Sequence, residues 1–333
     1  MVAELKATMF EAIDAQKKKG KTIMTGLKAA ISAIAVHPSQ PYLAVAQDDG
    51  YIGIYNYEHN FQMVKLDDVT KKDKKSNDKV AERIPKLGDA KDGKPPRKRL
   101  ITCLEFTPEG ELLIALAKGK IEVMSMDDMV IDEYPSDLST SDTGNAVPIT
   151  LLVVSHDGKY FAVADEKNCV CLYKKDHNNG DPDAEICWQF NGKVKSHVTE
   201  ITSICFSNSL DTDDPLRLFS IGKDRRCFEY NVEKSTKNDG LPPLSMFYLE
   251  KESLPTACIW YPSALDSKEG LLLTANNEYK MKLWNPTARN SRRTCLGPTY
   301  GGEIKKLKLL EDVARDGKQY LLYSTAKKVV GLI

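Results

Sequence analysis

The sequence predicts an all-β fold, a β-propeller of six to seven blades, from three observations. Short apolar runs of strand length are separated by clusters of Gly, Pro, Asn and Asp along most of the chain, which is typical of antiparallel meanders. Two of these meanders carry an aspartate six residues before a tyrosine, at Asp49 and Tyr55 and again at Asp224 and Tyr230. About six such units of ~40–45 residues follow one another, which is the period of a propeller blade.

The unit around which the chain is organised spans residues 195–231 and contains three predicted strands. Ile201–Phe206 alternates polar and apolar residues, Leu216–Ile221 is mostly apolar, and Arg226–Tyr230 alternates again. Gly222–Asp224 supplies a tight turn between the second and third strands. Because neighbouring short strands joined by turns pair locally, we expect one antiparallel sheet here.

Four polar or aromatic residues of this unit, His197, Ser220, Asp224 and Tyr230, lie at strand ends or in the turn. The pattern resembles a WD repeat, in which such residues share hydrogen bonds within one blade, with Tyr230-Asn231 in the place of Trp-Asp. Buried polar groups are unfavourable unless every member is paired, and a complete network selects one packing. We therefore expect a structural network at this position.

The alternative is a hydrolytic set made of His197, Ser220 and Asp224. Acyl transfer needs an exposed nucleophile beside an oxyanion hole, and Ser220 ends an apolar strand without the glycine pattern of a nucleophile elbow. The sequence therefore favours a protein that is not an enzyme and has no catalytic residues.

The first repeat, residues 28–57, has the same organisation. Its predicted strands are Ile31–Val36, Tyr42–Ala46 and Tyr51–Tyr57. Asp48-Asp49-Gly50 is a strong hairpin signal. We expect Asp49 and Tyr55 to join a network like that of Asp224 and Tyr230.

The segment before this repeat divides into an N-terminal extension, residues 1–20, and a propeller that begins at residue 21. Residues 1–15 carry both helical and strand spacing, so their structure stays open. Lys21–Met24 is predicted as a strand that completes the last blade and closes the ring, because closure removes exposed sheet edges. An open arc completed by another domain or chain is the alternative.

The later repeats are more degenerate, and they span residues 100–134, 147–190, 195–249, 254–296 and 297–333. Trp284-Asn285 is the closest match to Trp-Asp, so Trp284 is expected in a network of its own. In the second repeat Met124 replaces the aromatic residue, and apolar packing must suffice. Asp176–Asp183 resembles a calcium loop only loosely, because its glycine stands fifth and the acidic residue at position twelve is missing.

A lysine-rich insertion, residues 65–99, interrupts the repeats and contains almost no aromatic residues. Such a composition buries too little apolar surface to order itself, which favours a solvated loop between strands. The second interpretation is an electrostatic tether for an acidic partner such as a tubulin surface. The basic residues that would form it are Lys71, Lys72, Lys74, Lys75, Arg97, Lys98 and Arg99.

Composition excludes several classes of function. The chain has 333 residues with 47 basic and 47 acidic side chains, so no overall field steers it to nucleic acid or an acidic membrane. No run approaches the ~18 apolar residues of a membrane span, and the first residues lack a signal-peptide core. Eight cysteines without a CxxC pair and five scattered histidines indicate reduced buried thiols and no metal site or cofactor.

Three stretches carry a family resemblance: Lys28–Pro41, Leu216–Tyr230, and Asn276–Leu283 followed by Leu296–Gly301, which reads LGPTYG. Together they are similar to the C-terminal propeller of the cilia- and flagella-associated protein 251 family, WD-repeat proteins of motile axonemes. The similarity covers most of residues 20–333, and LGPTYG is its most specific part. The basic insertion is longer than the family pattern. Larger family members carry a further N-terminal propeller and some carry a C-terminal calcium-binding extension, and we expect neither in this chain.

The resemblance implies a non-catalytic scaffold of the axonemal cytoskeleton in the cilium or flagellum. Its partners would be the other subunits of the calmodulin- and spoke-associated complex, calmodulin directly or indirectly, radial spoke base proteins and the doublet microtubule. Pro298 and Tyr300 in the LGPTYG stretch are the candidate partner-binding residues. The alternative is a WD-repeat adaptor in another assembly, such as ciliary transport or a ligase.

Deleting residues 68–96 tests the interpretation of the insertion. We expect the deletion to leave a single cooperative thermal unfolding transition, because closing or shortening a surface loop changes stability by only about 1 kcal/mol. Circular dichroism during heating measures the transition. A broad, non-cooperative melt of the deletion variant would mean that the insertion is part of the folded body.

Overall fold

The computed structural model describes residues 29–56, 63–65, 100–126, 147–177, 186–208, 215–261, 270–312, 318–327 and 330–332. Every regular element in these ranges is a β-strand, and the strands form six separate antiparallel sheets. The all-β prediction is therefore confirmed. The predicted strand Lys21–Met24, the N-terminal extension and most of the insertion lie outside the described residues.

Each sheet is one blade, numbered here along the chain. Blade 1 contains β1 (Ile31–Val36), β2 (Tyr42–Gln47), β3 (Ile52–Asn56) and β4 (Met63–Lys65). Blade 2 contains β5 (Ile101–Phe106), β6 (Leu112–Leu116) and β7 (Ile121–Met124). Blade 3 contains β8 (Ile149–Val154), β9 (Tyr160–Asp165), β10 (Cys169–His177) and β11 (Ile186–Lys195).

Blade 4 contains β12 (Ile201–Phe206), β13 (Arg217–Gly222), β14 (Arg226–Asn231) and β15 (Pro243–Tyr248). Blade 5 contains β16 (Pro255–Tyr261), β17 (Leu271–Asn276), β18 (Lys280–Asn285) and β19 (Asn290–Leu296). Blade 6 contains β20 (Ile304–Asp312), β21 (Lys318–Thr325) and β22 (Val330–Leu332). In every blade the strands pair in the order of the sequence, as a meander.

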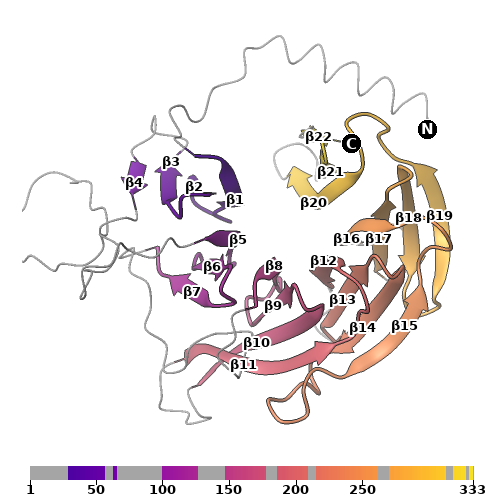
Figure 1. Cartoon of the computed structure of the whole chain (residues 1–333), viewed down its shortest axis with the longest axis horizontal. Helices are drawn as coiled ribbons and strands as arrows, with labels where there is room; N and C mark the ends of the chain where they lie inside the picture. Colours follow the sequence, from indigo (N-terminus) through magenta and orange to yellow (C-terminus); the bar gives the residue numbers. More distant parts are fainter. Residues whose placement is uncertain are drawn as a thin grey trace, which may run out of the picture.

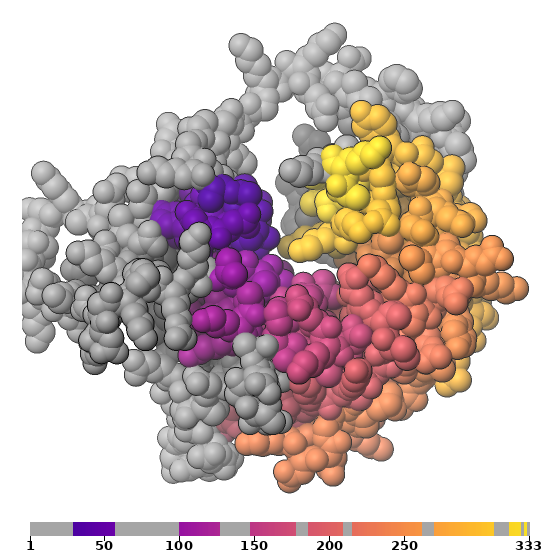
Figure 2. Space-filling view, in the orientation of Figure 1, coloured from indigo at the N-terminus to yellow at the C-terminus, as the bar shows by residue number. Residues whose placement is uncertain are grey.

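The blades stand around a common centre, with the first strand of each blade innermost and the last strand outermost (Figure 1). The innermost strands contact one another in the order β1, β5, β8, β12, β16 and β20. Blades 1 and 6 are separated by an opening, which is also visible in the space-filling view (Figure 2). The described blades therefore form an arc of a propeller.

Apolar side chains between neighbouring blades make the core. Ile101 and Leu104 of β5 pack against blade 1, and Ile201 and Ile204 of β12 pack against blade 3. Each blade is thus apolar on both faces, as a sheet buried on two sides must be. Ile34, the counterpart of Leu104 in blade 1, is 51% exposed where Leu104 is 4% exposed, because it lies on the side of blade 1 that faces the opening.

A backbone feature recurs in the turn between the second and third strands of blades 1 to 5. One residue of this turn has a positive φ, and these residues are Gly50, Gly119, Asn168, Arg225 and Tyr279. Only glycine adopts this conformation without steric conflict, while other residues need support from their surroundings. The recurrence shows that five blades share one hairpin geometry although only two use glycine.

A second recurrent feature lies at the start of each innermost strand, where the register with the second strand shifts by a β-bulge. Threonine occupies the bulge in four blades and donates its hydroxyl to a carbonyl of the second strand, as Thr202 does to Ile221 at 3.3 Å. The other three are Thr102, Thr150 and Thr256. Thr202 also bonds the Pro255 carbonyl of the next blade at 3.0 Å, so the bulge fixes the spacing of blades 4 and 5.

Candidate functional site

The four residues singled out in blade 4 meet in one hydrogen-bonded chain. His197 precedes β12, and its ring nitrogens lie between Asp224 and Ser220, with Nδ1 2.9 Å from Asp224 Oδ1 and Nε2 2.7 Å from Ser220 Oγ. Ser220 Oγ is 2.6 Å from the Tyr230 hydroxyl, which also contacts the Ser196 hydroxyl. The chain links β13 and β14 to the segment before β12 and ends in the hairpin.

A neutral His197 satisfies every member of this chain. Its Nδ1–H donates to the Asp224 carboxylate, and its Nε2 accepts from Ser220. Ser220 accepts from Tyr230, and Tyr230 accepts from Ser196. Burial lowers the pKa of His197 despite the raising effect of Asp224, and burial raises the pKa of Tyr230 so that its phenol keeps its proton.

Asp224 also ties the network to the backbone of the hairpin. Its carboxylate accepts from the amides of Val198 and Arg226, each at 3.2 Å. Gly222 makes room for the imidazole, because a Cβ at this position would lie 2.6 Å from His197 Nδ1. The sequence signal Gly-Lys-Asp therefore encodes both a tight turn and the space for the histidine ring.

Ser220 is fully buried in the middle of the blade. Its oxygen is occupied on one side by His197 and on the other by Tyr230. A nucleophile must reach a substrate carbonyl, and this serine faces only its own blade. The geometry of the four residues is thus that of a structural support inside the sheet.

The other expected network members do not repeat this arrangement. Asp49 accepts the Tyr51 amide at 3.2 Å, and the buried hydroxyl of Tyr55 has no hydrogen-bond partner among the described residues. The expectation of a shared network for this pair is therefore corrected. The reason is chemical, since Val45 stands in blade 1 where Ser220 stands in blade 4.

Trp284 is buried between blades 4 and 5, where its ring lies 5.6 Å from that of Phe247. Its indole N–H has no hydrogen-bond partner within the described part of the chain. The polar role expected for Trp284 is corrected as well, and the residue contributes apolar contact. Thr274 occupies the serine position of this blade and donates to its neighbour's carbonyl, Lys282 O, at 3.4 Å.

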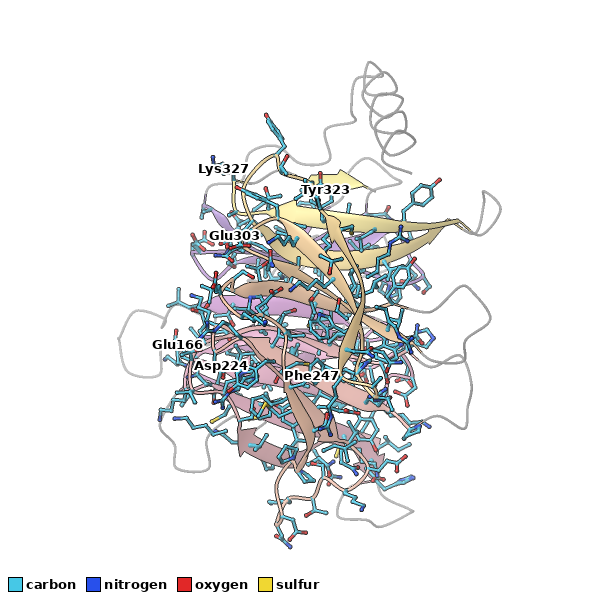
Figure 3. All side chains as sticks on the ribbon, turned by 90° about the vertical axis from the view of Figure 1, so that its right-hand side faces the viewer. Glu166, Asp224, Phe247, Glu303, Tyr323 and Lys327 are labelled. Carbon is cyan, nitrogen blue, oxygen red and sulfur yellow. The ribbon has the colours of Figure 1, made fainter. Side chains whose placement is uncertain are left out.

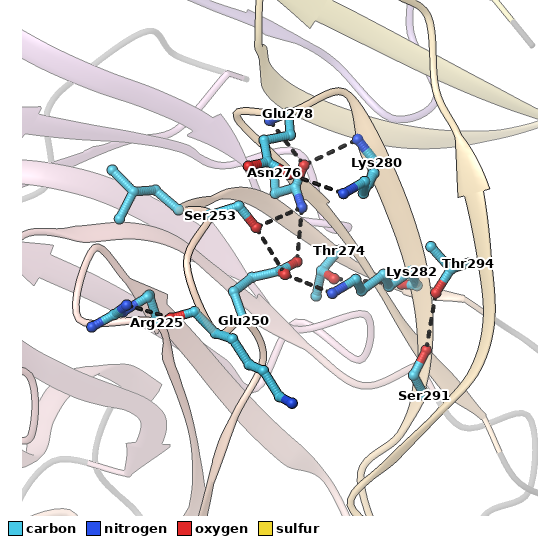
Figure 4. A network of polar contacts seen from close by, with 12 residues as sticks. Arg225, Glu250, Ser253, Thr274, Asn276, Glu278, Lys280, Lys282, Ser291 and Thr294 are labelled. Carbon is cyan, nitrogen blue, oxygen red and sulfur yellow. Dashed lines mark hydrogen bonds and ion pairs between the residues drawn. The ribbon is translucent and has the colours of Figure 1, made fainter.

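Blade 5 instead has a different polar network, which the sequence analysis missed (Figure 4). The buried Glu250 accepts from Ser253, from Asn276 at 2.9 Å and from Lys282 Nζ at 2.6 Å. Asn276 Oδ1 in turn accepts the amides of Glu278 and Lys280, each at 3.0 Å. The network supports the hairpin between β17 and β18, which corresponds to the hairpin that His197 and Asp224 support in blade 4.

In blade 3 a single side chain accepts the amides of the corresponding hairpin. Asp165 ends β9 at the position of Gly222 and Asn276, and its Oδ1 accepts the amides of Lys167 and Cys169 at 3.0 and 2.9 Å. An Asp or Asn that ends an apolar strand, followed four residues later by the next strand, is the signal that could have revealed these caps.

The turns between the second and third strands of the blades lie on one rim of the propeller, which is called the hairpin rim below. Glu166, Asp224, Glu303 and Lys327 mark this rim in Figure 3. The LGPTYG stretch joins β19 to β20 on the same rim, where the Lys327 amide donates to the Gly301 carbonyl at 3.0 Å. Tyr300 is 76% exposed, so the candidate partner-binding residue presents its ring to the surroundings of the rim.

Other chemistry expected from the sequence is placed as follows. The seven basic residues chosen in the insertion lie outside the described residues. Among the residues that are described, no three His, Cys, Asp or Glu side chains form a group that could hold a metal ion. The described chain likewise contains no helix with the length and apolar character of a membrane span.

Comparison with known proteins gives the same architecture and a family. The profile of the WD domain, G-beta repeat, matches residues 20–56. Cilia- and flagella-associated protein 251 of Tetrahymena thermophila is 33% identical over 356 residues, which covers 100% of this chain and 33% of that protein. The mouse protein of the same name is 31% identical over 90% of this chain and 20% of its own length.

The chain is a homologue of cilia- and flagella-associated protein 251. It spans about a third or less of the length of these curated relatives. A solved structure of the mitotic checkpoint complex contains a chain that superposes with a TM-score of 0.58 over 94% of this chain and 80% of its own, at 12% identity. That similarity concerns the fold alone, and with the repeat match it confirms a WD40-type propeller.

The network of blade 4 in this homologue can be tested by substituting its hairpin aspartate. Asp224→Ala should lower the free energy of unfolding by about 1–3 kcal/mol, because it leaves His197 and two amides without their acceptor. Urea denaturation measures the change. Asp49→Ala, at the matching position of the blade 1 hairpin, is the control and should change stability by less than about 0.5 kcal/mol. Equal effects of the two substitutions would contradict the buried-network interpretation.

The pKa of His197 predicts a pH dependence of stability. Because burial depresses its pKa in the folded state, unfolded chains bind the proton more readily, so the His197 contribution is complete above about pH 6.5 and falls as pH decreases. We expect the stability difference between wild type and His197→Gln to shrink from pH 8 to pH 5. Urea midpoints at several pH values measure this, and a difference that grows toward low pH would show the opposite shift.

Proposed function

We propose that this WD-repeat protein is a non-catalytic scaffold of the motile ciliary axoneme, at the base of a radial spoke on the doublet microtubule. There it regulates motility as part of the calmodulin- and spoke-associated complex. The observation that carries the proposal is the similarity to cilia- and flagella-associated proteins along the whole chain.

The similarity extends across distant organisms. Relatives of the same name occur in an orangutan, at 31% identity over 91% of this chain, and in Chlamydomonas reinhardtii, at 24% identity over 98% of it. A fold alone does not determine a function. A segment that stays alignable from end to end in proteins named for cilia and flagella supports a ciliary role better than the propeller does.

The distribution of polar groups fits a scaffold. The networks centred on His197 and Glu250 are buried inside or between blades and are saturated by their own neighbours. Tyr300, in a loop of the hairpin rim, is instead exposed and available to a partner. Exposed aromatic residues in loops are preferred anchors in protein interfaces.

We assign Pro298 and Tyr300 to partner binding at this rim. The partners proposed are other subunits of the calmodulin- and spoke-associated complex, calmodulin directly or through them, radial spoke base proteins and the doublet microtubule. An acidic tubulin surface would suit the lysines of the insertion, Lys71, Lys72, Lys74 and Lys75 among them, by charge.

Fractionation of ciliated cells that express a tagged copy tests the proposal. We expect the tagged protein to stay with detergent-extracted axonemes and to be released only by strong salt, because polar interface contacts weaken with ionic strength. Immunoblots of the fractions measure this. Recovery in the soluble cell-body fraction, with neighbours from a transport or ligase complex in proximity labelling, would replace the proposal with the adaptor alternative.

Tyr300→Ala tests the assigned rim contact. Loss of an aromatic anchor commonly weakens an interface by about 2 kcal/mol, or roughly 30-fold, so a larger fraction of the variant should be soluble. Thr294→Ala, at an exposed position of β19, is the control and should fractionate like wild type. Equal retention of both variants would remove Tyr300 from the interface.

A further inference from the structure

The outermost strand of blade 4 exposes an apolar stripe. β15 contains no charged residue between Pro243 and Tyr248. Leu244, Met246 and Tyr248 are 58%, 39% and 57% exposed. A strand at the edge of a sheet offers unpaired backbone groups to another strand, and an uncharged apolar edge is the kind that pairs.

Neighbouring blades protect the same place differently. β19 is the outermost strand of blade 5, and all seven of its residues are exposed, but Arg292 and Arg293 stand at its centre. β11 of blade 3 ends with Lys193 and Lys195. Charged side chains on edge strands oppose pairing with further strands. Among the four-stranded blades 3, 4 and 5, only blade 4 lacks this protection.

β1 also exposes several aliphatic side chains, but the opening between blades 1 and 6 explains their exposure. Ile31, Ile34 and Val36 of β1 are exposed on the blade that borders the opening. β15 lies on the outer wall of blade 4, away from this opening (Figure 1). Its stripe is therefore not accounted for by the packing of the arc.

The register of β15 places two of its exposed side chains on one face of the sheet. Met246 is opposite Phe228 and Tyr248 is opposite Arg226. The Arg226 guanidinium lies 5.5 Å from the centre of the Tyr248 ring and donates to its hydroxyl at 3.2 Å. Leu244 is the extra residue of a bulge, between the pairs of Glu229 and Tyr230.

We propose that a second copy of this chain pairs with β15, strand against strand, about a two-fold axis that passes beside Met246. An axis perpendicular to the sheet reverses the strand direction and preserves its faces, so the pairing is antiparallel and keeps Met246 and Tyr248 of both copies on one side. Met246 then stands opposite Met246 of the partner subunit, and Tyr248 stands near Leu244 of the partner subunit.

Charge does not oppose a second copy at β15. In this arrangement each Arg226 lies on β14, one strand inward from β15 and opposite Tyr248, which is two residues from the axis. The two Arg226 residues are therefore about 20 Å apart. That is beyond the screening length of about 8–10 Å in physiological salt. The same arrangement on β19 would bring arginines to directly opposed positions and would be repulsive.

The contact is small, which sets its strength. Three side chains and a short ladder cover much less than the ~800 Å² per partner of a standard interface. We expect a reversible dimer with a dissociation constant of tens of micromolar. A concentration series from about 1 to about 500 micromolar crosses the transition, and sedimentation velocity of the full chain measures it.

Met246→Lys identifies the surface. It places like charges at the axis and should abolish the dimer at all concentrations, while the melting temperature stays unchanged because the side chain is exposed. Thr294→Lys on β19 is the matched control and should dimerise like wild type. A dimer that survives Met246→Lys, or a wild-type chain that is monomeric throughout the series, overturns the proposal. The monomeric result would leave the stripe to an extended strand of a different protein.

Cross-linking tests the register. In a Cys295→Ser background, which removes the exposed thiol of β19, Met246→Cys should form a disulfide-linked dimer under mild oxidation. Directly opposed residues of antiparallel strands have Cα atoms about 4.5–5.5 Å apart, within the range that a disulfide spans. Thr294→Cys in the same background should stay monomeric. Equal yields from the two variants would contradict the two-fold pairing.

Discussion

Every blade of this protein depends on its neighbours to cover an apolar face. Leu104, Leu152 and Ile204 occupy the same position on successive innermost strands, and each is buried by the preceding blade. A single sheet with two apolar faces would not be stable in water. Stacking around a centre satisfies this constraint, and between blades 4 and 5 the bulge residue Thr202 adds a hydrogen bond to the Pro255 carbonyl.

The hairpin rim shows that one geometric requirement admits several chemical solutions. The backbone must turn through a residue with positive φ, and the amides of the turn need acceptors. Asp165 caps them alone, Asn276 does so with support from Glu250, and Asp224 does so while holding His197. Because the fold requires only that the acceptors be present, the residues that supply them differ from blade to blade.

The architecture was predictable from local patterns, since alternation, turn clusters and the Asp224–Tyr230 spacing are all short-range signals. Contacts between blades were not. Glu250 meets Asn276 only because the connection from β15 to β16 passes beside the next hairpin, and a linear spacing does not encode that approach. The same limit explains Asp49 and Trp284, whose spacing matched the repeat while the residues around them could not complete a polar network.

The serial contact of the blades has a mechanical consequence. Among the described residues, blades 2 to 5 each touch one blade before and one after, so within this part of the chain a force applied to the outer wall of blade 4 passes to blade 1 through the two blades between them. In such a series the softest junction deforms first, and the other junctions stay close to their resting geometry. Between blades 4 and 5, Thr202 bonds Pro255 and Cys205 touches Cys258, sulfur to sulfur, at 3.6 Å, so at that junction a hydrogen bond and a sulfur contact add to the apolar packing that a load must displace.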